Sequence, residues 1–108
     1  MGTTKTEGFS QQTMKMADAL KALGHPARLA IMDFLATRDA CFCGDIVEEL
    51  PLAQSTVSRH LAELKNAGLI QGTISGKNTC YCVNQENWKA LQEAFAAMAA
   101  RVCSPKCC

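Results

Sequence analysis

The stretch Gln54-Ser55-Thr56-Val57-Ser58-Arg59-His60-Leu61 decides the fold, because its apolar and polar residues separate onto two sides of a predicted helix. Val57, Leu61 and Leu64 recur at positions i, i+4 and i+7, which gives the helix (about 54–67) one apolar face. The other face carries small or hydrogen-bonding groups near the helix N-terminus, of the kinds that suit base edges and phosphates. These candidate DNA contacts are Gln54, Ser55, Thr56, Ser58, Arg59 and His60.

Three further helices are predicted on the N-terminal side of this stretch. Apolar residues fall at near-helical spacing from Ser10 until Gly24, a natural C-terminal stop. Pro26 suits the first turn of a second helix, because its missing N–H is not needed there. A short third helix is expected to begin near residues 41–44 and to end at Pro51, so that it and the helix over 54–67 form a helix-turn-helix.

On the C-terminal side, residues 69–75 and 79–83 read as two strands joined by a Gly-containing loop that carries Lys77, a further candidate DNA contact. A last helix, about 85–100, has apolar residues at alternating spacings of three and four, as in a helix–helix seam. The order of elements predicts a mainly α fold with one β-hairpin: a winged helix-turn-helix domain.

Length and composition are consistent with one domain. The 108 residues allow a single core, and 48% hydrophobic with 19% charged residues is typical of a globular chain. We expect an N-terminal arm (1–9), the folded domain (10–102) and a cysteine-rich tail (103–108). No apolar run approaches the roughly 18 residues that span a bilayer, and no signal peptide is apparent, so we expect a cytoplasmic protein without a membrane partner.

Seven cysteines in such a chain favour metal binding or redox sensing over a disulfide framework. Cys41 and Cys43 lie at the expected start of the third helix, where positions i and i+2 point roughly 200° apart. Both sulfurs reach one ion only if that turn is distorted. This predicts a switch in which ion binding strains the third helix, which supports the helix over 54–67. The alternative is that the two are small hydrophobic residues.

Two other groups of cysteines stand further along the chain. Cys103, Cys107 and Cys108 fall within six residues on the tail and can form a three-sulfur site or lend one sulfur to Cys41 and Cys43. Cys80 and Cys82 share one face of a predicted strand, with Cα atoms about 6.5–7 Å apart, which makes a direct disulfide awkward. We interpret that pair as two small residues compatible with a strand.

The sequence resembles the ArsR/SmtB family of bacterial metalloregulatory repressors. Residues 23–29 resemble the family's opening to its second helix, residues 54–61 its recognition helix, and residues 41–46 the Cys-x-Cys-x-Asp-Leu motif of its arsenic and cadmium/lead branches. The resemblance implies a homodimer on operator DNA that an inducer releases. It also implies an interface through the first and last helices, for which the candidates are Leu20, Trp88, Leu91, Phe95 and Met98.

Three departures from the family pattern bear on function. Ala53 stands where the family usually caps the recognition helix with Ser or Thr, Ile46 stands where a third cysteine often follows the pair, and residues 1–40 contain no cysteine. A four-thiolate cadmium site is therefore disfavoured. The thiol-only ligand set favours As(III) or Sb(III) as inducer, with no organic cofactor.

Two functions other than an arsenic-responsive repressor also use cysteine thiols. The same thiols suit a redox-sensing repressor that forms disulfides. A thiol enzyme would need an activated Cys-x-x-Cys motif or an oxyanion loop, and neither is present. We therefore predict a regulator and not an enzyme.

Overall fold

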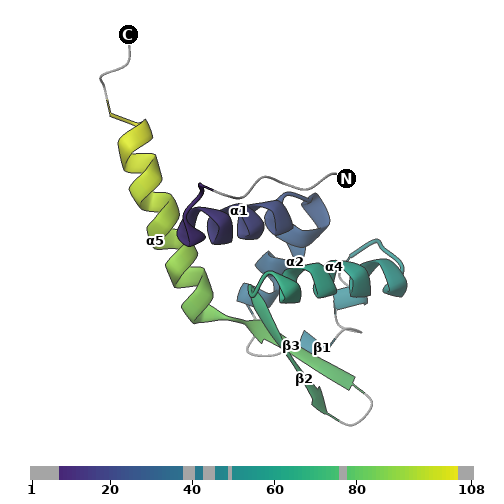
Figure 1. Ribbon diagram of the computed structural model, residues 1–108. Coiled ribbons are helices and arrows are strands. Elements are labelled where there is room, and N and C mark those ends of the chain that lie inside the picture. Colours follow the sequence, from purple (N-terminus) through teal and green to yellow (C-terminus); the bar gives the residue numbers. More distant parts are fainter. Residues whose placement is uncertain (1–7, 38–40, 43–45, 49, 76–77, 105–108) are drawn as a thin grey trace.

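The computed structural model describes residues 8–37, 41–42, 46–48, 50–75 and 78–104 of the chain. Along the chain its elements are α1 (Gln11–Leu23), α2 (Pro26–Ala36), β1 (Cys41–Phe42), α4 (Gln54–Asn66), β2 (Ile70–Ser75), β3 (Asn78–Val83) and α5 (Gln85–Val102). A helical turn at residues 46–48 lies between β1 and α4 and carries no label of its own. Figure 1 shows α1, α2 and α4 gathered into one body, with the hairpin on one side and α5 extending away from it. The predicted mainly α fold with a β-hairpin is confirmed.

Local signals in the sequence set the ends of the first two helices. The side chain of Ser10 accepts a hydrogen bond from the Thr13 amide at the start of α1, and Gly24 follows its end. In α2, Pro26 occupies the first turn, and the Nδ1 atom of His25 accepts from the Ala27 amide at 3.0 Å. Such caps satisfy amide groups that have no partner within the helix.

The core lies where α1, α2, α4 and the hairpin meet. Val57, Leu61 and Leu64 are fully buried, as the spacing in α4 predicts. Ile31 and Leu35 of α2 join them, together with the other buried apolar residues Ala19, Ala22, Met32, Ile46, Leu69 and Ile70. Burying a large aliphatic side chain stabilises the fold by about 1.5–3 kcal/mol, so these residues hold α4 firmly against the domain.

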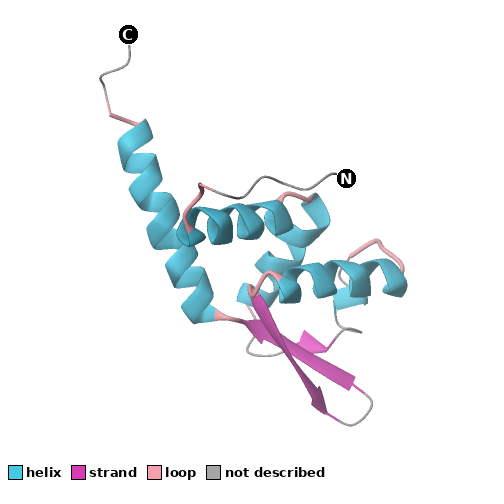
Figure 2. Cartoon of the chain, viewed as in Figure 1, coloured by secondary structure: helices cyan, strands magenta, loops and turns pink. Residues whose placement is uncertain are grey.

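The sheet has three strands rather than the two predicted, in the order β1-β3-β2, and all neighbours are antiparallel. β2 and β3 pair from Ile70 with Val83 to Ser75 with Asn78, which confirms the hairpin. On the other side of β3, Cys41 pairs with Tyr81 and Phe42 with Cys80. Figure 2 shows the short strand beside the hairpin, coloured magenta like β2 and β3.

The prediction that the third helix begins near residues 41–44 is therefore wrong for Cys41 and Phe42, while residues 43–45 lie outside the described part of the chain. Cys41 and Phe42 are extended and hydrogen-bonded to β3, and the helical turn is described at residues 46–48. The apolar pattern did not separate the two possibilities, because a run this short suits a strand as well as a helix. The edge of β3 supplies backbone partners to β1, and this long-range pairing decides between them.

The last helix is long and is only partly covered by the rest of the chain. None of the residues of α5 is fully buried, although Trp88 and Leu91 pack against the edge of the core. Asn84 caps its N-terminus, because the Asn84 side chain accepts a hydrogen bond from the Asn87 amide. None of the helices in the described part of the chain has the length and apolar character that crossing a membrane requires.

Candidate nucleic-acid interface and thiol sites

The first two turns of α4 present a polar face to solvent. Gln54, Ser55, Ser58 and Arg59 are exposed and Thr56 is half-buried, while the opposite face is held in the core. Lys77, the remaining candidate for a DNA contact, lies outside the described residues. The arrangement gives a firmly packed helix whose exposed side carries hydrogen-bond donors and acceptors, which is what a recognition helix requires.

The N-terminus of α4 has no side-chain cap. Ala53 occupies the capping position and makes no side-chain hydrogen bond, as its residue type predicts. The first amide groups of a helix carry a partial positive charge and readily accept an anion. In α4 these amides lie beside the exposed polar residues, so this end of the helix offers hydrogen-bond donors to an anionic group.

His60 differs from the other residues of the predicted DNA-binding set. Only 8% of it is exposed, and its Nδ1 atom accepts a hydrogen bond from Nε of Arg28 at 3.1 Å. Arg28 also donates from Nη1 to the carbonyl oxygen of Ala22 at 3.2 Å, near the end of α1. The placement of His60 among the DNA contacts is corrected: its side chain joins α4 to α2 through Arg28, and Arg28 in turn bonds α1. Arg28 makes structural contacts, because both of its hydrogen bonds go to groups of this domain.

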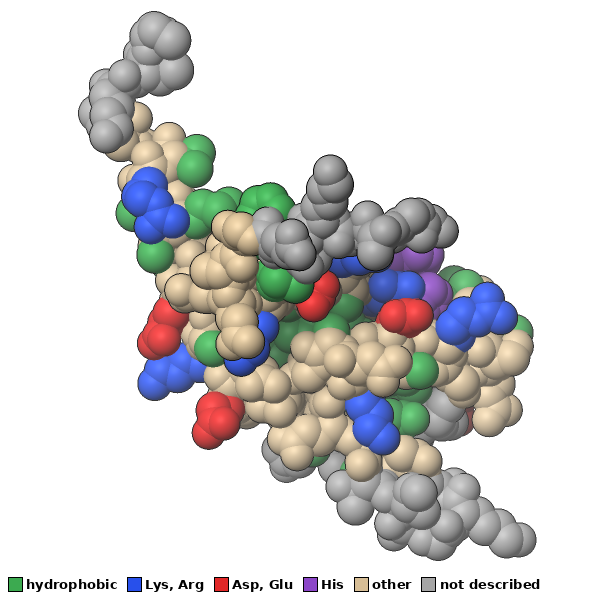
Figure 3. Space-filling model, viewed as in Figure 1, with side chains coloured by type: hydrophobic (Ala, Val, Ile, Leu, Met, Phe, Trp, Pro, Cys, Tyr) green, Lys and Arg blue, Asp and Glu red, His purple; other side chains and the backbone are tan. Residues whose placement is uncertain are grey.

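A second histidine completes this junction. The rings of His25 and His60 lie 4.5 Å apart between centroids and are tilted by 45°, and the histidine side chains (purple) lie beside Lys or Arg side chains in Figure 3. Burial lowers the pKa of His60 below its ordinary value of 6.5, and the charges of His25, Arg28 and Arg59 lower it further, against an opposite effect of Glu63. A neutral imidazole has the lone pair that Nδ1 needs to accept from Arg28.

The predicted inducer cysteines are only partly within the described chain. The backbone of Cys41 lies in β1, whereas Cys43 lies outside the described residues. Cys41 lies in a strand and not in the first turn of a helix. The prediction of strain assumed that both cysteines lie on a helix and point about 200° apart, and that assumption does not hold for Cys41. The register also pairs Cys41 with Tyr81 and not with either cysteine of β3.

Cys103 is the one tail cysteine that the structure describes, and it follows the end of α5 that lies far from the sheet. Cys103 is exposed immediately after α5, and Cys107 and Cys108 lie outside the described residues. The 18 residues of α5 span about 27 Å at 1.5 Å per residue, and Figure 1 shows this helix leading away from the sheet. Within the described residues, no three Cys, His, Asp or Glu side chains gather as a metal site.

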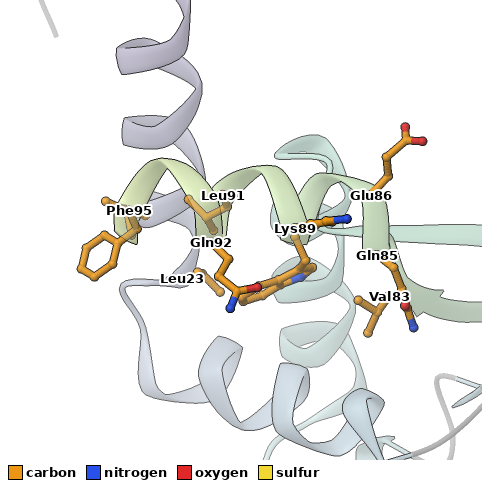
Figure 4. Close-up of a pocket in the computed structure, with 10 residues that line it drawn as sticks. Leu23, Val83, Gln85, Glu86, Lys89, Leu91, Gln92 and Phe95 are labelled. Carbon is orange, nitrogen blue, oxygen red and sulfur yellow. The ribbon is translucent and has the colours of Figure 1, made fainter. Parts of the chain in front are cut away.

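An apolar groove runs between α1 and α5. It has a volume of about 780 Å³, and its lining includes Leu20, Leu23, Trp88, Leu91 and Phe95. Figure 4 shows the α5 side chains along the groove, with the ring of Phe95 standing out at one end. Leu20 and Phe95 are 38% and 48% exposed, and Nε1 of Trp88 is buried with no hydrogen-bond partner in the described part of the chain. Met98, the last of the predicted interface residues, is half-buried further along α5.

Comparison with known proteins bears on this arrangement. Residues 25–71 match the model of the bacterial regulatory proteins of the arsR family. The chain is 36% identical over 78 residues to an HTH-type transcriptional regulator of Methanocaldococcus jannaschii, covering 71% of this chain and 86% of that protein. It is 31% identical over 75 residues to the regulator YgaV of Escherichia coli K12, covering 69% and 76% of the two chains.

The chain belongs to the ArsR family. Solved structures agree in fold: a crystal structure of an ArsR family transcriptional regulator superposes with a TM-score of 0.76 at 19% identity, covering 91% of this chain and 99% of that one. HlyU from Vibrio cholerae superposes with a TM-score of 0.68 at 25% identity, covering 82% and 96%. The winged helix-turn-helix prediction is thereby confirmed. These relatives are transcriptional regulators and not enzymes, as the absence of an activated thiol motif predicted.

Sequence reasoning missed two features of this ArsR-family chain. The hydrogen bond between Arg28 and His60 joins residues 32 positions apart, and no local sequence pattern predicts it. The pairing of β1 with β3 was missed for the same reason, although the aromatic residue Phe42 favours a strand and Gly44 disfavours a helix. Both features connect the recognition helix or the wing to the rest of the domain.

Proposed function

We propose that this transcriptional regulator represses its target by binding operator DNA as a homodimer, and that trivalent arsenic or antimony bound to cysteine thiolates releases it. The observation that supports DNA binding is the exposed polar side of α4. Gln54, Ser55, Ser58 and Arg59 stand there on a helix whose opposite side is fixed in the core, beside an uncapped N-terminus. In helix-turn-helix proteins, such side chains at the N-terminal end of the second helix contact base edges.

The groove between α1 and α5 supports the second part of the proposal, which is that the protein forms a dimer. A second copy would cover the exposed rings and aliphatic groups of Leu20 and Phe95 and the groove beside Leu91, all of which solvent contacts in a single chain. It would also offer a partner to the buried Nε1 of Trp88. A two-fold dimer then places two α4 helices on two half-sites of the operator.

For the inducer, we propose Cys41 and Cys43 as core ligands, with a third sulfur from Cys103, Cys107 or Cys108. The length and direction of α5 within one chain favour a tail from the partner subunit as the source. Thiolates are the ligands that soft metals and metalloids prefer. The coupling would run through β1, which is hydrogen-bonded to the hairpin and is followed by the turn that contains the fully buried Ile46. A ligand on β1 can therefore move both the wing and the support of α4.

An operator-release titration tests the proposal. Arsenite should weaken operator binding about 5–150-fold, which corresponds to a coupling of about 1–3 kcal/mol. Cys41→Ser with Cys43→Ser should keep DNA binding and abolish the release, and Cys107→Ser with Cys108→Ser is the matched control with the same number of thiols removed. If the first variant responds like the wild type and the second does not respond, the tail is the sensor and the assignment is wrong.

The same titration separates metalloid sensing from redox sensing. It is run under full reduction, where no protein disulfide forms, and a redox-sensing repressor then does not respond to arsenite. Release by an oxidant alone, with no response to arsenite or antimonite in reductant, would reject the proposed inducer and favour the redox-sensing alternative.

A further inference from the structure

Two thiols stand on the outward face of β3. Cys80 and Cys82 alternate along the strand with Tyr81 and Val83, which pack against the core. Because successive residues of a strand point to opposite faces, the two cysteines share the face that points away from that core. Both are half-buried and neither is in a disulfide. Free cysteine is among the residue types that are most often fully buried, so a pair accessible to solvent on one face is unusual.

The spacing of the two thiols disfavours a direct disulfide and favours a bridge through one additional atom. Residues i and i+2 of a strand have Cα atoms about 6.5–7 Å apart, at the upper edge of the range of about 4.4–6.8 Å found for disulfides. A direct sulfur–sulfur bond would therefore strain β3, which is held by hydrogen bonds on both sides. One additional atom between the sulfurs lengthens the bridge and allows both cysteines to stay in the strand.

The surroundings of the pair favour a soft ligand that needs two sulfurs. The strand positions paired with Cys80 are Thr73 and Phe42, and the position paired with Cys82 is Gln71. None of these residues supplies a carboxylate or an imidazole, the groups that harder ions require. In the described part of the chain no third Cys, His, Asp or Glu completes a metal site around the pair.

We propose that Cys80 and Cys82 form a dithiol site for trivalent organoarsenicals, compounds in which one carbon substituent already occupies one of the three valences of arsenic. With an arsine oxide R–As=O, two S–As bonds form and the As=O bond breaks. The oxygen leaves as water with the two thiol protons, and arsenic stays trivalent. Inorganic arsenite, whose full thiolate complex needs three sulfurs, is held less well. The site does not depend on the proposed inducer role of Cys41 and Cys43.

Phenylarsine oxide and tryptic mapping test the site in the full-length, reduced protein. Cleavage after lysine and arginine separates the thiols, since residues 39–59 carry Cys41 and Cys43 and residues 78–89 carry Cys80 and Cys82. Of the tail cysteines, Cys103 lies on residues 102–106, and the other two form residues 107–108. The protein with Cys41→Ser and Cys43→Ser is labelled at one equivalent in an excess of a monothiol. We expect the bridged adduct on residues 78–89, with at least tenfold less arsenic retained there from arsenite at the same concentration.

Single substitutions distinguish a bridge from two separate thiols. Cys80→Ser and Cys82→Ser should each lower the adduct retained on residues 78–89 by tenfold or more, because a second linked thiol acts at an effective concentration in the millimolar range and a single S–As bond exchanges with free monothiol. Circular dichroism and operator binding check that each variant is folded. Labelling confined to residues 102–108, or an adduct on residues 78–89 that survives either single substitution, would overturn the proposal.

Discussion

Replacing Arg28 by alanine tests whether the histidine junction holds the recognition helix. Arg28→Ala removes the donor to Nδ1 of His60 and the donor to the Ala22 carbonyl. A hydrogen bond that involves a charged group contributes about 1.5–3 kcal/mol. His60 is 8% exposed, so water cannot readily replace the lost donor there. Arg28 itself is half-buried, and water can replace it at the Ala22 carbonyl. We therefore expect the free energy of unfolding to fall by about 2–4 kcal/mol, close to one and a half such bonds.

The measurement is urea unfolding of wild type and variant at one fixed protein concentration, because the stability of a dimer depends on concentration. A loss of this size lowers the thermal midpoint by roughly 10–20 °C in a domain of this length. Arg28→Lys keeps the charge but has one compact head group in place of the planar fork, so it should recover only part of the loss.

Arg59→Ala is the matched control for this experiment. It removes the same side chain from the neighbour of His60, but Arg59 is exposed on α4, so its stability should stay within about 0.5 kcal/mol of wild type. If Arg28→Ala unfolds at the same urea concentration as Arg59→Ala, the bond to His60 does not hold α4 and the reasoning is refuted.

Three other predictions concern His60, Arg59 and Phe95. The pKa of His60 is lowered in the folded chain, so its contribution to stability is complete above the ordinary value of 6.5. That contribution is lost as the pH falls from there towards the lower folded pKa. The difference in the free energy of unfolding between pH 7.5 and pH 5.5 should therefore be smaller in His60→Gln than in wild type. Arg59→Ala should weaken operator binding, measured by fluorescence anisotropy, by about 1–3 kcal/mol, and unchanged affinity would remove Arg59 from the interface. Phe95→Asp should give monomers in sedimentation and lose operator binding, because it places a charge in the apolar groove; a variant that stays dimeric would put the interface elsewhere.

Local patterns in the sequence predicted most of the fold. The capping residue Ser10, the stop at Gly24 and the proline at residue 26 mark the limits of two helices because each acts on the backbone within a turn of itself. The spacing of Val57, Leu61 and Leu64 predicted which side of α4 is buried. The exposed polar side of α4 could be predicted with it, since one periodicity fixes both faces.

Only the tertiary structure decided the features that depend on distant partners. His60 has a polar side chain on a predicted DNA-binding helix, yet a guanidinium 32 residues away gives it a buried hydrogen bond. Cys41 stands in a strand because β3 offers it backbone partners, whereas the two-residue segment by itself suits a helix start as well. The sequence by itself determined the elements whose limits and faces are set by neighbours along the chain. Burial and pairing with remote residues determined how the wing, the thiols and the recognition helix are joined.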